Sequence, residues 1–253
     1  MTMQTQPFTG LLRRGLRPAG GFTLVELAVV LVVVGLLMAL LLGPLVAQQQ
    51  QKQIGDTRRQ LEDIKESLLG FAMANGRLPC PASTTSATGA EDCAIRIGVL
   101  PWSVLGLREN DAWGHRFTYA VTPYFADAIA ACTYSLATAV APDCPNAPTQ
   151  ASFSLAAAGD LTLRDGTGGG ANTLATSLPV LVISHGPTGH GAYLATGVQI
   201  PGSTADEAEN ADADLVFVSR NYDDTAGNDF GHLVAWLPVT TLTNRVVTAG
   251  RLP

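Results

Sequence analysis

The chain has 253 residues, of which 47% are hydrophobic and 14% charged, and its 21 acidic against 15 basic side chains give a formal net charge of −6. This length accommodates one domain with an extension. The acidic balance argues against non-specific nucleic-acid binding, which depends on many lysine and arginine contacts to phosphate.

An uncharged apolar run extends from Leu27 to Ala47. Its length matches the roughly 20 residues that a helix needs to cross a bilayer. Arg13, Arg14 and Arg17 precede it, and without these three the remaining balance is 12 basic (15 minus 3) against 21 acidic residues. The positive-inside rule therefore predicts one membrane span with a cytoplasmic N-terminus.

The junction before this run has the wrong order for a secretory signal peptide. Such a peptide places its small-residue cleavage site after the apolar stretch, whereas here glycines precede it, in the sequence GGFTLVEL at residues 20–27. A cut between Gly21 and Phe22 would leave the apolar helix on the mature chain.

This junction resembles the precursors of type IV pilins and type II secretion pseudopilins, which carry a basic leader ending in glycine, then Phe-Thr-Leu-Ile/Val-Glu and a long apolar helix. The resemblance implies cleavage after Gly21 and N-methylation of Phe22 by a prepilin peptidase in the bacterial inner membrane. It also implies that the chain is not an enzyme. Its implied partners are the peptidase, other pilin or pseudopilin subunits in a filament, and an inner-membrane assembly platform.

Glu26 is a carboxylate in a helix that otherwise avoids charge, which costs about 3 kcal/mol at the centre of a bilayer. One interpretation gives it a role in assembly, where it pairs with the Phe22 amine of a neighbouring subunit. The other interpretation places it at the headgroup interface, facing water.

Apolar residues then recur at helical spacing, at Ile54, Leu61, Ile64, Leu68 and Phe71. They predict one helix from residue 22 to about 75, stopped by Gly76. The predicted organisation is a leader (1–21), a transmembrane helix (22–47), an amphipathic continuation (48–76) and a periplasmic or extracellular head (77–253). The short stripe favours packing on the chain's own sheet over an intermolecular coiled coil.

The head contains short β-like runs between Gly, Pro, Asn and Asp residues. They predict an α+β, pilin-like fold, in which the long N-terminal helix packs on an antiparallel sheet. The predicted strands are 116–121, 152–157, 180–184, 215–219 and 233–237. A stretch from Asp111 to Tyr119 also resembles part of the major pseudopilin of type II secretion, although the large head favours a minor subunit.

The four cysteines, Cys80, Cys93, Cys132 and Cys144, all follow the span and form no CxxC pair. Outside the cytoplasm such residues form disulfides. Of three possible connectivities, we predict the local pairs Cys80–Cys93 and Cys132–Cys144.

Eight of the 21 acidic residues lie between Asp206 and Asp229, with Arg220 as the only basic residue among them. Such crowding is unfavourable unless water or a cation screens it, and oxygen-rich loops suit Ca²⁺. Residues 228–231 also loosely resemble the calcium loop of the major pseudopilin. The segment is either a solvated surface loop or a calcium site, with candidate ligands Asp212, Asp214, Asp223, Asp224, Asn228 and Asp229.

Two other functions compete with a purely structural role. An adhesive or DNA-uptake minor pilin is one, but DNA binding requires a basic stripe, and the seven basic residues after Arg77 are widely spaced among acids. A periplasmic hydrolase built on Ser184, His185 and His190 is the other, but neither GxSxG nor HExxH occurs. The sequence leaves open whether the filament is a pilus or a secretion pseudopilus.

Overall fold

The computed structural model describes residues 21–126, 152–202, 204–225 and 227–252, except the side chains of residues 39–47. The chain divides into two compact units, Met1–Gln48 and Gln49–Pro253. In chain order its elements are α1 (Leu24–Asn75), β1 (Ile97–Val99), α2 (Trp102–Leu105), β2 (Thr118–Val121), α3 (Pro123–Ala126), β3 (Leu161–Arg164), β4 (Thr173–Leu178), β5 (Val180–Ser184), α4 (Ala205–Glu209), β6 (Val216–Val218), β7 (Leu233–Leu237) and α5 (Val239–Thr248).

The helix α1 confirms the predicted long helix. It begins two residues after the predicted start and ends at the predicted Asn75. Gly76 stops it by adopting a φ of 68°, and its N–H donates a hydrogen bond to the Ala72 carbonyl at 2.8 Å. A residue without a Cβ adopts this left-handed conformation at little cost, which is why glycine ends helices.

Among the residues that the structure describes, no helix has an apolar stretch long enough to cross a membrane. The predicted span includes residues 39–47, whose side chains lie outside the described part.

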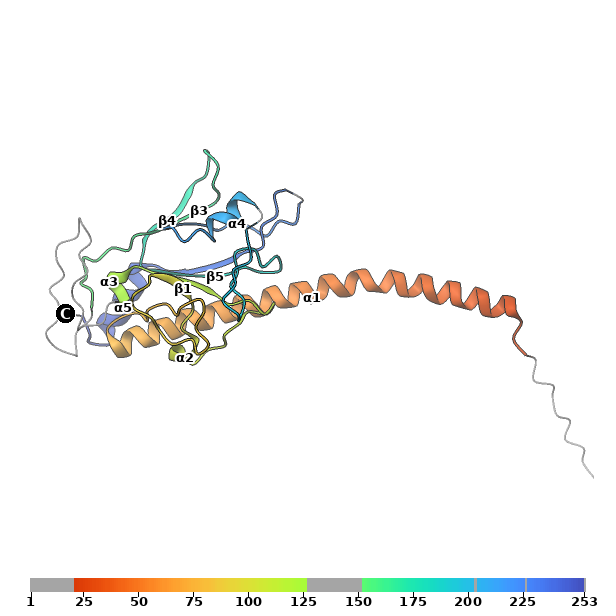
Figure 1. Ribbon diagram of the computed structural model, residues 1–253, viewed down its shortest axis with the longest axis horizontal. Helices are drawn as coiled ribbons and strands as arrows, with labels where there is room; N and C mark the ends of the chain where they lie inside the picture. The colour runs from red at the N-terminus through yellow and green to blue at the C-terminus, as the bar shows by residue number, and fades with distance from the viewer. Residues whose placement is uncertain (1–20, 127–151, 203, 226, 253) are drawn as a thin grey trace, which may run out of the picture. The chain divides into compact units, whose positions relative to one another are not determined.

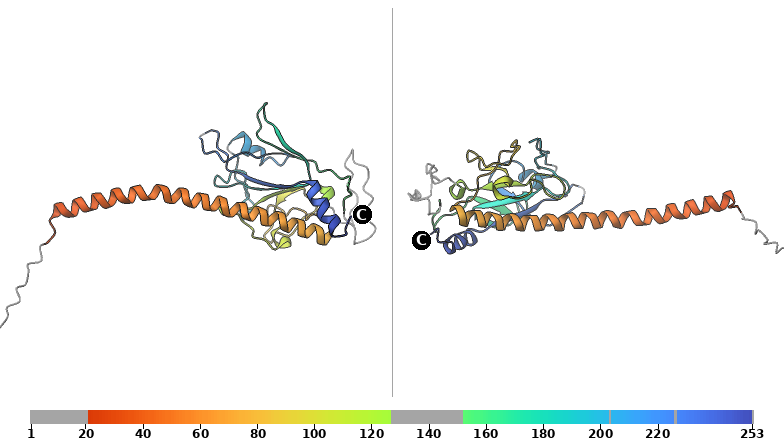
Figure 2. Two further views of the ribbon diagram at one scale, coloured as in Figure 1. Left: turned by 180° about the vertical axis from the view of Figure 1, so that it is seen from behind. Right: turned by 90° about the horizontal axis from the view of Figure 1, so that it is seen from below.

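The second unit contains two sheets. The larger one is antiparallel with the strand order β1-β2-β5-β7, and the smaller one has the order β4-β3-β6. In the smaller sheet β3 pairs with β4 antiparallel and with β6 parallel. Within this unit the last part of α1 runs along the larger sheet, with α5 (dark blue) beside the end of α1 (Figures 1 and 2).

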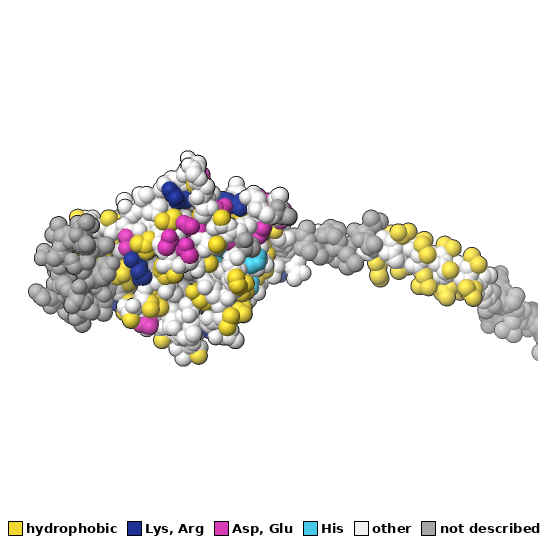
Figure 3. All heavy atoms as spheres, turned by 45° about the horizontal axis from the view of Figure 1, so that its top comes forward, with side chains coloured by type: hydrophobic (Ala, Val, Ile, Leu, Met, Phe, Trp, Pro, Cys, Tyr) yellow, Lys and Arg dark blue, Asp and Glu magenta, His cyan; other side chains and the backbone are white. Residues whose placement is uncertain are grey.

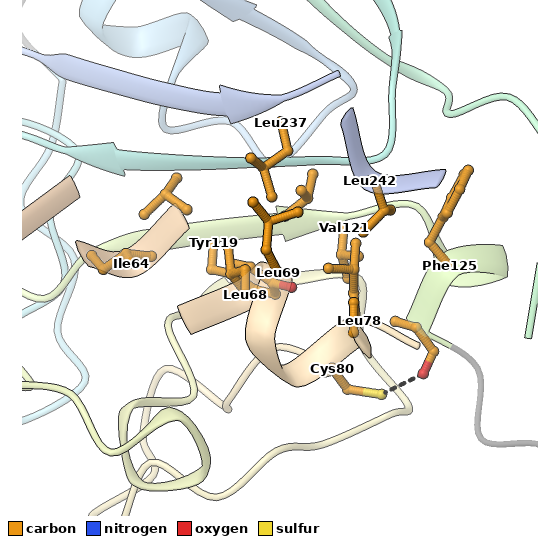
Figure 4. Close-up of a cluster of buried hydrophobic side chains, with 14 of the residues drawn as sticks. Ile64, Leu68, Leu69, Leu78, Cys80, Tyr119, Val121, Phe125, Leu237 and Leu242 are labelled. Carbon is orange, nitrogen blue, oxygen red and sulfur yellow. Dashed lines mark hydrogen bonds between the residues drawn. The ribbon is translucent and has the colours of Figure 1, made fainter. Parts of the chain in front are cut away.

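The larger core lies between α1 and one face of the larger sheet. Leu61, Ile64 and Leu68 of α1 pack in one cluster with side chains of β2, β5, β7 and α5 (Figure 4). Tyr119 and Val121 of β2 face this cluster, because alternate residues of a strand point to the same side. Four of the five residues of the predicted stripe are therefore buried, namely Ile54, Leu61, Ile64 and Leu68, whereas Phe71 is half-buried.

The opposite face of the larger sheet forms a second core with the smaller sheet. Ala120, Leu181 and Ile183 pack there against apolar residues of β3, β4 and β6. All five residues of β5 are buried, as expected for a strand covered on both faces, which forms a continuous apolar run. The head thus has three layers, formed by α1, the larger sheet and the smaller sheet.

The strand predictions are confirmed in part. The strands β5 and β7 have the predicted bounds, and β2 and β6 are shorter than predicted. The prediction of a strand at 152–157 is wrong: the Ser152 N–H donates to the Gly76 carbonyl at 2.8 Å, and a turn follows. Its apolar signal comes from Phe153, whose ring packs on Phe125 with centroids 4.7 Å apart.

Candidate functional site

The start of α1 is fixed by a reciprocal pair of hydrogen bonds. The Glu26 N–H donates to Thr23 Oγ1 at 3.2 Å, and the Thr23 N–H and hydroxyl each donate to Glu26 Oε2 at 2.9 Å. This is a capping box, which satisfies backbone donors that a helix start leaves unpaired. Thr-x-x-Glu, at residues 23–26, is the sequence signature of this cap.

The capping box leaves the predicted cleavage point outside the helix. Gly21 and Phe22 precede α1, and both are exposed, Phe22 to 86%. A peptidase requires an accessible, non-helical bond, and the Gly21–Phe22 peptide bond meets both conditions. The rest of the predicted leader, residues 1–20, lies outside the described residues.

The first part of α1 carries large apolar side chains on all sides of the helix. From Leu24 to Met38 every large hydrophobic residue is at least 41% exposed. A soluble monomer rarely exposes a contiguous apolar surface of this kind, which marks a membrane or protein interface. The only charged residue in this stretch is Glu26.

The family model of the prokaryotic N-terminal methylation motif matches residues 16–42, a span that contains Gly21, Phe22 and Glu26. No curated protein and no solved structure matches the chain. The match supports the resemblance to the type IV pilin and pseudopilin family. The motif implies an N-terminus that is membrane-anchored before processing, and it is typical of prepilin peptidase substrates that assemble into filaments.

Cys80 and Cys93 form a disulfide in the head, as predicted. Glu91 lies in the loop that this disulfide closes. Its carboxylate accepts hydrogen bonds from both terminal nitrogens of Arg77, at 2.9 and 2.7 Å, and from the Cys80 N–H at 3.0 Å. The hydrogen bonds from Arg77 lower the pKa of Glu91 below its usual value. The predicted pair Cys132–Cys144 lies outside the described residues.

Ser184 and His185 do not form a nucleophile and base in the structure. Ser184 Oγ donates to Asp111 Oδ2 at 2.6 Å, while His185 Nε2 shares a hydrogen bond with Thr118 Oγ1 at 2.8 Å. Ser184 and His185 are fully buried. A serine hydrolase needs a serine that is bonded to its base and open to substrate, so these contacts instead connect β2, β5 and the loop before β2.

A second histidine, His232, lies against His185, with ring centroids 4.6 Å apart. Its Nδ1 shares a hydrogen bond with the Asn210 amide at 2.9 Å. Burial lowers the pKa of His232 to about 4, and burial together with the neighbouring His232 lowers the pKa of His185 well below 6.5. Both rings are therefore neutral at physiological pH and act as hydrogen-bonding core residues.

The structure distributes the predicted calcium ligands over two turns. Asp212 and Asp214 lie before β6, where each carboxylate accepts a backbone N–H two residues ahead. Asp223 accepts from the Thr225 N–H and from the Asn228 amide. Four of the six residues are exposed, namely Asp212, Asp214, Asp224 and Asn228. A calcium ion bound by this set stays a prediction.

The described part of the head carries mixed charge. Acidic and basic side chains form separate small patches on the face in Figure 3. Four arginines of the head are held in ion pairs, namely Arg77 with Glu91, Arg96 with Asp160, Arg116 with Glu109 and Arg220 with Asp206. The described residues on this face therefore present no continuous basic stripe of the kind that tracks a nucleic-acid backbone.

Proposed function

We propose that the chain is a structural subunit, a minor pilin or pseudopilin, of a type IV pilus or type II secretion pseudopilus, and that prepilin peptidase cuts it after Gly21. The observation that carries this proposal is the motif at residues 16–42, in which an exposed Gly21–Phe22 bond precedes an apolar helix. In this proposal the chain has no catalytic role.

The proposed location is the bacterial inner membrane, with residues 22–47 as a single anchor and the head in the periplasm or on the filament. The arginines before the apolar run and the acidic chain after it support this orientation. The Cys80–Cys93 disulfide supports a head outside the cytoplasm, because cytosolic thiols are kept reduced.

Glu26 connects processing to assembly. Cleavage would create a positive amine at Phe22, four residues before this carboxylate. Both hydrogen bonds from Thr23 go to Oε2, so Oε1 is available to accept from the Phe22 amine of a neighbouring subunit. An ion pair enclosed by apolar helices is a strong orienting contact, because unpaired charge there is costly.

The test is intact-mass analysis of the full-length gene product from a host with prepilin peptidase and from an otherwise identical host without it. We expect a mature chain that begins at Phe22 and carries one added methyl group in the first host, and the uncut chain in the second. A different N-terminus, or the same mass in both hosts, would contradict the proposal.

A further inference from the structure

Two loops and the short helix α4 bring one histidine and two carboxylates of the head together. His190 follows β5, Glu207 lies in α4, and Asp229 precedes β7. Their nearest ligand atoms all lie within 4.8 Å of one another. His190 Nδ1 is 2.8 Å from Glu207 Oε2.

A second group of this kind among the described residues, Cys80 with Glu91 and Cys93, is unsuited to a metal. Its two sulfurs are joined in a disulfide, and a metal ligand must be a thiolate. Its carboxylate already binds both terminal nitrogens of Arg77. In the group of His190, Glu207 and Asp229 no sulfur is oxidised, and an imidazole and carboxylates bind metal without a change of oxidation state.

We propose that His190, Glu207 and Asp229 bind a divalent transition-metal ion, with Zn²⁺ as the best match. One imidazole and two carboxylates are borderline donors that suit Zn²⁺, whereas Ca²⁺ takes six to eight oxygens. This is a different set from the six residues predicted from sequence, with which it shares only Asp229.

The distances fit an ion of this size. Zn²⁺ binds nitrogen and oxygen at about 2.1 Å, which places tetrahedral ligands about 3.4 Å from one another. The separations of 2.8 Å and of up to 4.8 Å bracket that value. On binding, Nδ1 gives up the proton that it donates to Glu207, which moves to Nε2 or to solvent, and small rotamer changes bring all three atoms to a shared ion. The His190 side chain is 31% exposed, which gives a path from solvent and room for a water as fourth ligand.

Neighbouring groups already orient the ligands. Glu207 Oε1 accepts from Thr188 Oγ1 and from the Gly231 N–H, both at 3.0 Å. Thr204 Oγ1 donates to the Asp229 carbonyl at 3.1 Å and accepts the Glu207 N–H at 3.3 Å. Supporting hydrogen bonds of this kind fix the geometry of metal ligands in proteins.

Glu207 is the buried member of the group. Its side chain is 0% exposed, and hydrogen bonds from Thr188, Gly231 and His190 hold its carboxylate in place. A divalent ion would supply positive charge and would join the loops after β5, around α4 and before β7.

The test uses the untagged full-length chain in detergent, stripped of metal, with Zn²⁺ as the probe. We expect calorimetry to show one ion per chain, and the unfolding midpoint to rise by about 5–10 °C at a hundredfold excess over the dissociation constant. The variants His190→Gln and Asp229→Asn should each weaken binding by about tenfold or more, while Glu66→Gln, which changes an exposed carboxylate on α1, serves as a control with unchanged binding.

Glu207→Gln retains acceptors for Thr188 and Gly231 and should also lose Zn²⁺, with circular dichroism as a check on folding. If this variant fails to fold, the His190 and Asp229 variants decide the matter. The proposal is overturned if Zn²⁺ gives no binding heat, if these two variants bind it as the parent chain does, or if Ca²⁺ binds equally well and Asp224→Asn abolishes that binding.

Discussion

The two parts of α1 share one backbone conformation but differ in how far their apolar side chains are exposed. From Leu24 to Met38 the large hydrophobic side chains are exposed on every side of the helix, whereas Leu61, Ile64 and Leu68 are at most 4% exposed. The first pattern is apolar all round, and the second is a stripe with charged residues between its members. Hydrophobic periodicity therefore distinguishes the part of α1 that packs on its own sheet from the part whose apolar side chains are exposed.

The largest expected effect concerns the first part. Gly21→Leu should block processing almost completely, because a bulky side chain would not fit where the peptidase accepts a small residue, while Gly21→Ala should be cut. Intact mass in a host with the peptidase distinguishes precursor from mature chain. Equal processing of the two variants would contradict the assignment of Gly21 to the cleavage site.

A matched pair of leucines tests the difference between the two parts. Leu68→Ala removes a fully buried side chain and should lower the free energy of unfolding by about 3 kcal/mol. Leu31→Ala, where the leucine is 63% exposed, should leave the unfolding of the head unchanged. Denaturant unfolding followed by tryptophan fluorescence reports on the head, and equal losses in both variants would abolish the distinction.

The disulfide should matter locally. A double Cys80→Ser, Cys93→Ser variant loses a cross-link whose cysteines are 13 residues apart, worth roughly 3 kcal/mol in the chain-entropy model. Hydrogen exchange should accelerate in residues 81–92 more than in β2 and β5. Uniform acceleration across the head would show instead that the loop is part of the main cooperative core.

The smallest effect is expected at Glu91. Its pKa is lowered by Arg77, so the folded state binds its proton less readily than the unfolded chain does. The contribution to stability is complete above the unfolded pKa of about 4.5 and is lost as pH falls through the folded value. Glu91→Gln should cost about 1.5 kcal/mol at pH 7 and should reduce the acid sensitivity measured by unfolding at pH 7 and pH 3.

Sequence patterns predicted the elements that have strong hydrophobic periodicity or a clear stop residue. The stripe and Gly76 gave the end of α1, and the continuous apolar run of β5 gave its bounds. The smaller sheet was not predicted as such. Its strand β4 is mostly exposed, and β6 joins β3 in a parallel pair that is distant in sequence. Tertiary pairing decides such strands more than local propensity.

The same contrast holds for the candidate sites. The proposed cleavage and assembly residues lie close together in the sequence, so a linear motif from Gly21 to Glu26 predicts them. His190 and Asp229 lie in loops and Glu207 lies in α4, and the first two positions are 17 apart in the sequence. No motif spacing predicted this group, because only the folding of β5, α4 and β7 brings its members together.

The most direct test of the proposed filament role compares the parent chain with Glu26→Val in purified filaments from the native host. Both chains should insert in the membrane and be cut to begin at Phe22, but only the parent should be recovered in filaments, because the variant lacks the carboxylate that pairs with a neighbour's amine. Mass spectrometry of the filament and membrane fractions gives both quantities. Recovery of the two mature chains in filaments at equal levels, or absence of the parent chain from them, would contradict the account.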